Sequence, residues 1–329
     1  MNNTFEAKCS SVQRNLWEIN YNGTVYGAQI DRLYKNKDLP CVGDNVSFRV
    51  DEYGNIFITE IASRKNELFR MNNGKKQQIA SNIDVVFVVS SMNNEFNIGK
   101  LERFAILANI PDARICFVLT KKDLCSMPEV FEEIVKARFP NSPVVSTNAI
   151  ENDGVNEVLK LWGAGETAIF VGSSGVGKST LINALANKNL MRTGEIRDKD
   201  DKGRHTTTSR NLFYIDEGRI VIDTPGVRAV GVSKEENNEG IQEVFADIIE
   251  LEACCKYSNC NHAEGVKGCA IREAINNGEL DEGLFYRYLK FKRKEQSRKE
   301  IQQELTGVPE WKKIQMTKDR KKQSNHREM

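Results

Sequence analysis

The sequence lacks the marks of a membrane or secreted protein. Its longest apolar run, near Val85–Val89, is far too short to cross a bilayer. The segment Met1–Gln13 has no apolar core of the kind that secretory signals carry. We therefore expect a cytoplasmic protein that makes no contact with a membrane.

Histidine and net charge are also scarce. Only three histidines occur in 329 residues, and the formal net charge is +1. The charge is uneven, because residues 287–329 hold 14 Lys and Arg against 6 Asp and Glu, a net of +8. This asymmetry indicates a basic tail that meets an acidic partner such as a nucleic acid. The alternative is a solvated helix with no partner.

Disulfides are not expected, because the eight cysteines belong to a chain without a secretory signal. Half of them lie between Cys254 and Cys269, which indicates a metal. The pattern C-x₄-C-x-H-x₆-C supplies three thiolates and one imidazole, a set that suits tetrahedral Zn²⁺. Four protein ligands leave no open position, so we predict one structural Zn²⁺; the alternative is free buried thiols. The predicted ligands are Cys255, Cys260, His262 and Cys269.

The composition is that of a multidomain globular protein. Hydrophobic residues make up 40% of the chain and charged residues 28%, and the length suits two or three domains. Residues 1–70 favour a small closed β-barrel of OB type, because short β-branched and aromatic runs alternate with turn signals. These runs are Leu16–Ile19, Thr24–Ile30, Asn45–Val50 and Ile56–Ile61. Such barrels often bind RNA, although this one is not basic and could serve only for docking.

Residues 71–235 change to an α/β pattern. The continuous apolar run Asp84–Val89 is typical of a strand in a parallel sheet that is covered on both faces. Further strands are expected at Ile115–Leu119, Val144–Val145, Ala168–Val171 and Arg219–Ile222, and helices at Lys100–Ala108, Val130–Arg138 and Thr180–Leu185. Residues 236–329 favour helices at Gly240–Ala253, Ala270–Asn276 and Leu284–Leu289, followed by the basic tail.

A phosphate-binding loop follows the strand Ala168–Val171. Gly172–Ser179 fits G-x-x-x-x-G-K-[ST], in which glycines let backbone amides turn toward phosphates at the start of a helix. Lys178 would reach the β- and γ-phosphates, and the Ser179 hydroxyl would bind Mg²⁺. The alternative is an ordinary glycine-rich turn. The predicted contacts are Gly172, Ser173, Ser174, Gly175, Val176, Gly177, Lys178, Ser179 and Thr180.

A second loop predicts recognition of guanine. Thr120-Lys121-Lys122-Asp123 follows an apolar strand and fits [NT]-K-x-D. Asp123 can accept hydrogen bonds from both the N1–H and the exocyclic amine of guanine, a pair that adenine lacks. The Lys121 stem would pack on the base, and Thr120, which stands where Asn is usual, would share in the nucleotide contact. Ser146 begins a loop whose amide would face the guanine O6. One alternative is an ordinary surface turn. Another is a P-loop ATPase or kinase, and Asp123 argues against it because adenine lacks the matching pair of donors.

A third loop completes the predicted site. Asp223 follows a strand and would hold Mg²⁺ through water, and the Gly226 amide would touch the γ-phosphate. The polar segment Gly203–Thr208 lies where a switch belongs, and we favour Thr207 as its Mg²⁺ ligand. Many GTPases have Gln after the Gly that corresponds to Gly226, but this chain has Val227, which cannot orient water. We predict that His205 supplies that catalytic function.

The order of these loops indicates a circular permutation. In most GTPases the phosphate loop precedes the Lys-x-Asp loop, whereas here Asp123 and Ser146 come before Lys178. A permutation is tolerated when the original ends lie close together and the new break falls in an exposed loop. The break falls just after the Asp223 loop, so movement there would act on both flanking domains.

This set of motifs resembles the circularly permuted GTPases of bacterial ribosome small-subunit maturation, the RsgA/YjeQ type. The resemblance rests on Ser63–Arg70, the permuted loops, Gly203–Thr207, and the Cys255–Cys269 pattern with Ala270-Ile271. It implies an OB-type β-barrel at 1–70, a central α/β P-loop GTPase at 71–235 and a mostly α zinc-binding domain with a basic tail at 236–329. It also implies that the residue matching His205 helps catalysis.

The resemblance further implies a GTP hydrolase that binds the 30S subunit near its decoding region and acts in its late maturation. Hydrolysis would be stimulated by the subunit and coupled to release. The implied partners are the 30S subunit, 16S rRNA, and GTP or GDP with Mg²⁺, and we expect a monomer. Two alternatives stay open: a nucleotide-gated RNA or ribosome adaptor with incidental hydrolysis, and a permuted GTPase of the large subunit, which the zinc pattern opposes.

Overall fold

The structure is a computed structural model that describes residues 4–13, 16–34, 38–72, 75–191, 210–223 and 238–305. The chain divides into two compact units, Met1–Val244 and Phe245–Met329. None of the helices in the described ranges is long and apolar enough to span a bilayer. The predicted domain boundaries at residues 70 and 235 stay predictions.

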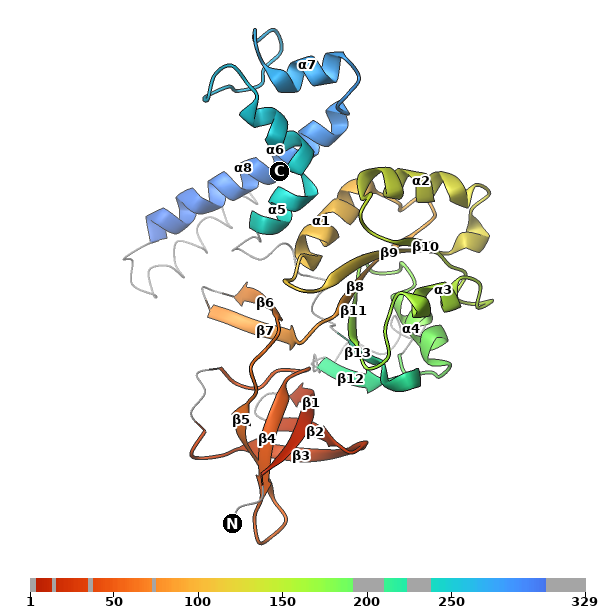
Figure 1. Ribbon diagram of the computed structural model, residues 1–329, viewed down its shortest axis with the longest axis vertical. Helices are drawn as coiled ribbons and strands as arrows, with labels where there is room; N and C mark the ends of the chain where they lie inside the picture. The colour runs from red at the N-terminus through yellow and green to blue at the C-terminus, as the bar shows by residue number, and fades with distance from the viewer. Residues whose placement is uncertain are drawn as a thin grey trace, which may run out of the picture. The chain divides into compact units, whose positions relative to one another are not determined.

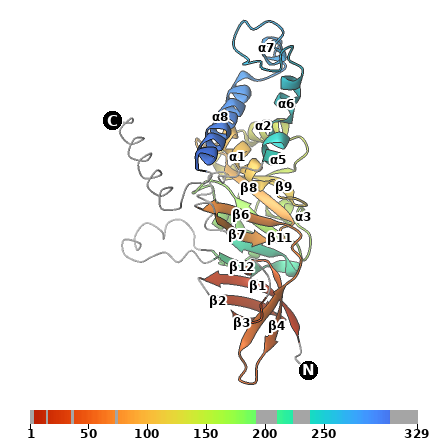
Figure 2. The same cartoon turned by 90° about the vertical axis from the view of Figure 1, so that its left-hand side faces the viewer.

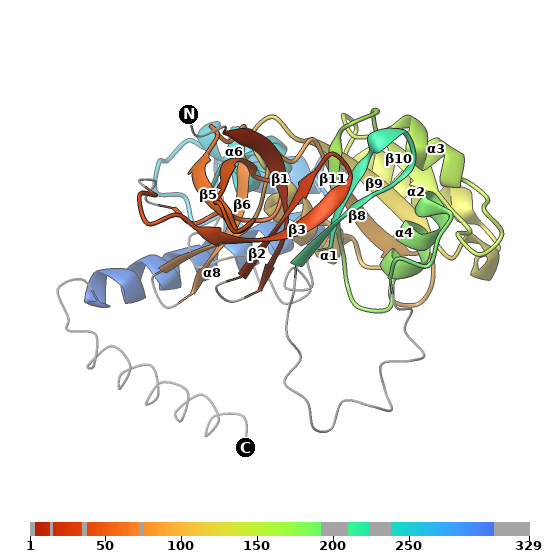
Figure 3. The ribbon, with the colours of Figure 1, turned by 90° about the horizontal axis from the view of Figure 1, so that it is seen from below.

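The first five strands close into the predicted barrel, which Figure 3 shows from below. They run in the order β1-β2-β3-β5-β4, and β4 pairs back with β1. Alternation along the strands builds the core, because Trp17 and Ile19 point inward while Leu16 and Glu18 are exposed. The strands are β1 (Phe5–Gln13), β2 (Leu16–Tyr21), β3 (Thr24–Ile30), β4 (Asn45–Val50) and β5 (Ile56–Ile61).

A separate hairpin follows the barrel, and the sequence did not predict it. Strands β6 (Glu67–Asn72) and β7 (Lys75–Ser81) pair antiparallel. The end of β7 meets a turn of the barrel, where the Ser81 amide donates to the Val42 carbonyl at 3.0 Å. A side chain on Gly43, at φ +96°, would clash with the Ser81 carbonyl, so glycine permits this close approach.

The central sheet contains five parallel strands, in the order β10-β9-β8-β11-β13. Strand β12 lies antiparallel beside β13 and pairs on its other side with β1 of the barrel. Among the described residues, eleven strands therefore form one continuous sheet. Figure 2 shows β12 between β11 of the parallel strands and β1 of the barrel. The strands are β8 (Val85–Ser91), β9 (Arg114–Thr120), β10 (Val144–Ser146), β11 (Thr167–Val171), β12 (Arg210–Tyr214) and β13 (Ile220–Asp223).

Helices cover both faces of the parallel strands, as predicted from the apolar run at Asp84–Val89 (Figure 1). On one face Phe87 packs with Trp162 and with residues of α3 and α4, and every residue of β8 is buried. Helices α1 and α2 lie against β8 and β10. The helices are α1 (Ile98–Ala108), α2 (Pro128–Arg138), α3 (Val155–Lys160) and α4 (Lys178–Ala186), with 3₁₀ turns η1 (Lys122–Leu124) and η3 (Asp216–Gly218).

The predicted single helix at Gly240–Ala253 is wrong, because Phe245 divides it. Phe245 has φ −119° and ψ 27°, outside the helical region, and its side chain is fully buried against Tyr288 and Phe291. The first piece, α5 (Asn238–Val244), belongs to the first unit. The second unit contains α6 (Ala246–Ala253), α7 (Ala270–Asn276) and α8 (Glu282–Leu305).

Candidate functional site

The parallel strands bring the predicted loops to one edge of the sheet. The carboxyl ends of parallel strands share an edge, which is where open α/β sheets bind ligands. Strand β9 ends at Thr120, β10 at Ser146, β11 at Val171 and β13 at Asp223. The Asp123 loop, the Ser146 loop, the phosphate loop and Asp223 therefore meet at this edge, although they are far apart in sequence.

The phosphate loop has the backbone that its glycines permit. Gly175 and Gly177 have φ of +81° and +91°, the left-handed region that favours glycine. A Cβ on Gly172 would lie 2.3 Å from the Val89 carbonyl oxygen, so a side chain there would push the loop off β8. The loop runs from β11 directly into α4, which begins at Lys178. This is the predicted strand–loop–helix arrangement.

Lys178 folds back over the loop that precedes it. Its Nζ donates to the carbonyls of Gly172 at 2.7 Å and Ser173 at 2.5 Å. The ammonium group is thus held at the centre of the loop, beside the start of α4. Ser173, Ser174 and Gly175 are partly or fully exposed at the crest of the loop, where a phosphate would lie. The arrangement suits an anion that replaces the two carbonyls as partners of Lys178.

Thr120 joins the second loop to the phosphate loop. It is buried, and its hydroxyl lies 2.5 Å from the Val176 carbonyl and 3.2 Å from the Ser90 carbonyl. A Cβ on Gly177 would lie 3.5 Å from the same hydroxyl. Thr120 thus contacts the phosphate loop itself. The prediction that it contributes to base contact stays a prediction.

Lys121 and Asp123 lie on the turn that follows. Lys121 has φ +61°, in the left-handed region, and precedes the 3₁₀ turn that holds Asp123. The Asp123 side chain is exposed. The Lys122 amide donates to the Thr147 carbonyl at 3.1 Å, so this turn is tied to the Ser146 loop. A backbone hydrogen bond therefore connects the two loops that are predicted to recognise the base.

The Ser146 loop is buried at its start. Ser146 and Thr147 are both buried, and the Thr147 amide donates to the Leu119 carbonyl at 2.7 Å. The next amide, of Asn148, donates to the Asp153 carbonyl at 2.9 Å. Both amides are thus used within the protein, and the amide contact with guanine O6 stays a prediction.

The predicted Mg²⁺ ligands are described only in part. Ser179 lies in the first turn of α4, and Asp223 ends β13 opposite Asn211 of β12. A hydroxyl and a carboxylate are the hard oxygen donors that Mg²⁺ prefers, so these residues fit the ion. The other three predicted site residues, His205, Thr207 and Gly226, lie outside the described residues.

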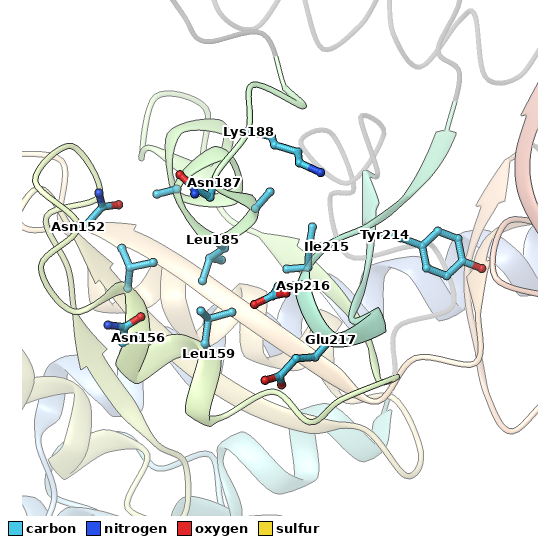
Figure 4. Close-up of a pocket in the computed structure, with 13 residues that line it drawn as sticks. Asn152, Asn156, Leu159, Leu185, Asn187, Lys188, Tyr214, Ile215, Asp216 and Glu217 are labelled. Atoms are coloured by element: carbon cyan, nitrogen blue, oxygen red, sulfur yellow. The ribbon is translucent and has the colours of Figure 1, made fainter. Parts of the chain in front are cut away.

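A hollow of about 700 Å³ lies away from these loops (Figure 4). The C-terminal end of α4, the start of α3 and the turn between β12 and β13 form its walls. Asn187, Lys188, Asp216 and Glu217 make its rim polar. Since Lys178 begins α4 and the hollow lies at the other end of the helix, the hollow contains none of the residues predicted to bind the nucleotide.

The four predicted zinc ligands come together in the second unit. Their donor atoms all lie within 4.8 Å of one another. The Nδ1 atom of His262 lies 3.4 Å from Cys269 Sγ and 3.7 Å from Cys255 Sγ. Tetrahedral Zn²⁺, with Zn–S of about 2.3 Å and Zn–N of about 2.0–2.1 Å, places such atoms about 3.5 Å apart. The residues therefore fit Zn²⁺.

Backbone contacts hold the segments that carry this cluster. A hydrogen bond from the His262 backbone lowers the pKa of the Cys260 thiol, which favours the thiolate that binds metal, whereas burial raises the pKa of the Cys269 thiol. Gly268, at φ +76°, lets its carbonyl accept from the Lys256 amide at 2.9 Å. Sequence reasoning missed Glu252, which contacts His262 at 3.0 Å. Glu252 lies on α6, three residues before Cys255, and this closeness in sequence to a predicted ligand was the signal that could have indicated it.

Comparison with known proteins gives a consistent result. The family model described as RsgA GTPase matches residues 61–233. The "Small ribosomal subunit biogenesis GTPase RsgA" of Leptospira interrogans (serovar Lai) is 36% identical over 252 residues, 75% of this chain and 70% of that protein. "RsgA 1" of Oceanobacillus iheyensis is 34% identical over 300 residues, 89% and 85% of the two chains.

Two solved structures share the fold. YjeQ from Thermotoga maritima has a TM-score of 0.65 at 24% identity, with 89% of this chain and 99% of that chain covered. The structure described as YloQ, a circularly permuted GTPase, has a TM-score of 0.61 at 23% identity, with 90% and 96% covered. With the family model spanning more than half of the sequence, these findings show that the chain belongs to the RsgA GTPase family.

Proposed function

We propose that this GTPase acts in the biogenesis of the small ribosomal subunit. The curated relatives carry that activity in their names. The chain would bind the 30S subunit and its 16S rRNA late in maturation, hydrolyse GTP in response to the subunit, and leave it afterwards. We propose that it works in the cytoplasm as a monomer.

The main support for the proposed nucleotide site is the contact between the Thr120 hydroxyl and the Val176 carbonyl. It fixes the end of β9 against the phosphate loop, 56 residues later in the sequence. Guanine would lie over Lys121 with its N1–H and amine on Asp123. Its phosphates would lie over residues 172–180, with Lys178 on the β- and γ-phosphates.

We propose that the hydrolytic step depends on Ser179, Asp223 and the segments that precede β12 and follow β13 in sequence. Mg²⁺ bound with GTP would neutralise charge that develops on the β- and γ-oxygens, held by Ser179, Thr207 and, through water, Asp223. The Gly226 amide would donate to the γ-phosphate. His205 would orient the attacking water, because Val227 has no hydrogen-bonding side chain.

We propose that the second unit holds one structural Zn²⁺ on Cys255, Cys260, His262 and Cys269. These four ligands leave no coordination position open for water or substrate, so the ion would stabilise the unit and take no part in hydrolysis. The basic helix α8 and the residues after it would face RNA. The barrel would supply a further contact with the ribosome.

The decisive experiment compares binding and turnover. Sedimentation of the GTP-analogue-bound protein with purified 30S and 50S subunits should show association with 30S. Co-sedimentation with 50S would instead favour the large-subunit alternative. His205→Ala tests the hydrolase against the adaptor alternative. If His205 positions the attacking water, the variant should lose the stimulated turnover while it still binds the subunit. Unchanged turnover would show that His205 does not position the water.

A further inference from the structure

Glu252 of α6 contacts both the candidate metal ligand His262 and helix α8. We propose that Glu252 is the positioning residue of the metal centre. It fixes the tautomer of His262 so that Nδ1 binds the metal, and it couples the centre to α8. This inference is independent of the nucleotide site and of the ribosome.

The two ring nitrogens of His262 face different partners. Nε2 lies 3.0 Å from Glu252 Oε1, whereas Nδ1 faces the sulfur atoms of Cys269 and Cys255 at 3.4 and 3.7 Å. An ionised carboxylate can only accept a hydrogen bond, so Nε2 must carry the hydrogen. The lone pair of Nδ1 is then left for the metal. This is the carboxylate–histidine–metal arrangement that orients a metal ligand.

The His262 ring is also held from its backbone and its edge. His262 has φ +54°, a conformation that residues other than glycine rarely adopt. Its carbonyl accepts from Arg272 Nε at 2.7 Å, and its ring meets Phe285 edge to face at 5.9 Å. With the side chain 8% exposed, the ring has little room to turn. The fixed ring therefore keeps Nδ1 toward the sulfur atoms, and the tautomer decides whether the Nδ1 lone pair is available to the metal.

Glu252 is itself held by two residues of α8. Tyr288 Oη donates to Oε2 at 2.7 Å, and Lys292 Nζ lies 2.7 Å and 2.9 Å from the two oxygens. Tyr288 and Lys292 are four residues apart and share one face of the helix. Tyr288 is buried, and the Glu252 side chain is 17% exposed. The carboxylate thus has a fixed position and joins α8 to the metal ligand.

Zinc affinity tests the positioning role. In the full chain, Glu252→Ala should weaken Zn²⁺ binding about 10- to 100-fold in competition with a chromophoric chelator, the range found for residues behind metal ligands. Glu252→Gln keeps a carbonyl oxygen that can accept from Nε2 and should lose less. Glu250→Ala, an exposed carboxylate on the same helix, is the matched control and should leave the affinity unchanged.

The tautomer gives a readout that a merely structural role would not change. In the zinc-loaded protein labelled with ¹⁵N-histidine, His262 should show a metal-bound Nδ1 and a slowly exchanging Nε2–H. In Glu252→Ala that proton should exchange faster. Tyr288→Phe removes a hydrogen bond to Glu252 without touching His262, and should also weaken zinc binding, by less. Coordination through Nε2, or an affinity unchanged in both Glu252 variants, overturns the proposal.

Discussion

At the residue scale, Thr120 shows how one side chain can support the phosphate loop from a neighbouring strand. The base-reading motif usually begins with Asn, and the sequence predicted only a share of the base contact for Thr120. In the structure its hydroxyl contacts the phosphate loop at the Val176 carbonyl. Since the residue is buried, the contact is shielded from water and fixes the loop before nucleotide binds.

Replacing Thr120 by Val keeps the shape but removes the donor to Val176. We expect affinity for GTP and GDP to fall together by roughly fivefold, because a hydrogen bond of this kind contributes about 1 kcal/mol. Titration with a fluorescent guanine nucleotide measures the change. Thr120→Ser retains the hydroxyl and should restore most of the affinity. A variant that binds like the unmodified protein would show that the contact does not organise the loop.

Asp123 carries the choice of base in the proposed site. Asp123→Ala should weaken GTP binding by about 10- to 150-fold, since hydrogen bonds to a charged group contribute about 1.5–3 kcal/mol. Weak binding of ATP should stay as it was, because adenine offers no pair of donors to this carboxylate. Glu133→Ala, an exposed carboxylate on α2, is the control. Equal losses for GTP and ATP would contradict the base assignment.

At the scale of elements, a buried ion pair joins the barrel to the hairpin β6–β7. Asp44 is fully buried in the turn before β4, and Arg64 donates to both of its oxygens at 2.8 Å. Ser81, at the end of β7, donates to the same carboxylate at 2.6 Å. The turn also donates its Cys41 amide to Asp44 at 2.8 Å. Three segments therefore meet at one carboxylate.

Arg64→Ala would leave Asp44 buried without its charged partner. We expect the free energy of unfolding to fall by about 3–5 kcal/mol, the usual cost of breaking one side of a buried pair. Urea unfolding followed by tryptophan fluorescence, which includes Trp17 of the barrel, measures it. Arg103→Ala, at an exposed position on α1, should change the stability by less than about 0.5 kcal/mol. Equal free energies of unfolding for Arg64→Ala and the unmodified protein would mean that this ion pair does not stabilise the fold.

The sequence predicted elements whose signal is local. The phosphate loop and the zinc spacing are short motifs, and the apolar run before Ser90 marks a buried parallel strand. Strand β1 was not recognised, because its buried Ser10 and Ser11 look polar in the sequence. Ser11 pairs with Glu18 of the neighbouring strand β2 and with Asn211 of the distant strand β12. The contacts of Glu252 with Tyr288 and Lys292 span 36 and 40 residues and leave no pattern in the sequence.

At the scale of the whole molecule, the chain order shows which parts adjoin the predicted nucleotide loops. Strand β12 pairs with β1, so the GTPase sheet and the barrel share a backbone ladder. The segment that holds His205 and Thr207 leads directly into β12. The second unit begins 22 residues after Asp223, at Phe245. The barrel is thus connected through strand pairing, and the second unit through the chain, to the segments that would contact the γ-phosphate.

Removal of the metal should change the stability of the second unit and leave the first unit unchanged. We expect a strong zinc chelator to speed amide hydrogen exchange in α6, α7 and α8, because the four ligands connect the segments before and after Cys260. Exchange in β8 and β11, which belong to the first unit, should not change, and guanine nucleotide affinity should persist. Slow exchange in α6–α8 after complete metal removal would show that the unit folds without the ion.

The most direct measurement is the GTP hydrolysis rate with and without purified small ribosomal subunits, in the unmodified protein and in Lys178→Ala. We expect slow turnover alone, because Val227 cannot orient water, a large increase with 30S subunits, and no increase in Lys178→Ala. The same slow rate with and without 30S subunits, or an equal increase with 50S subunits, would contradict a GTPase that responds to the small subunit.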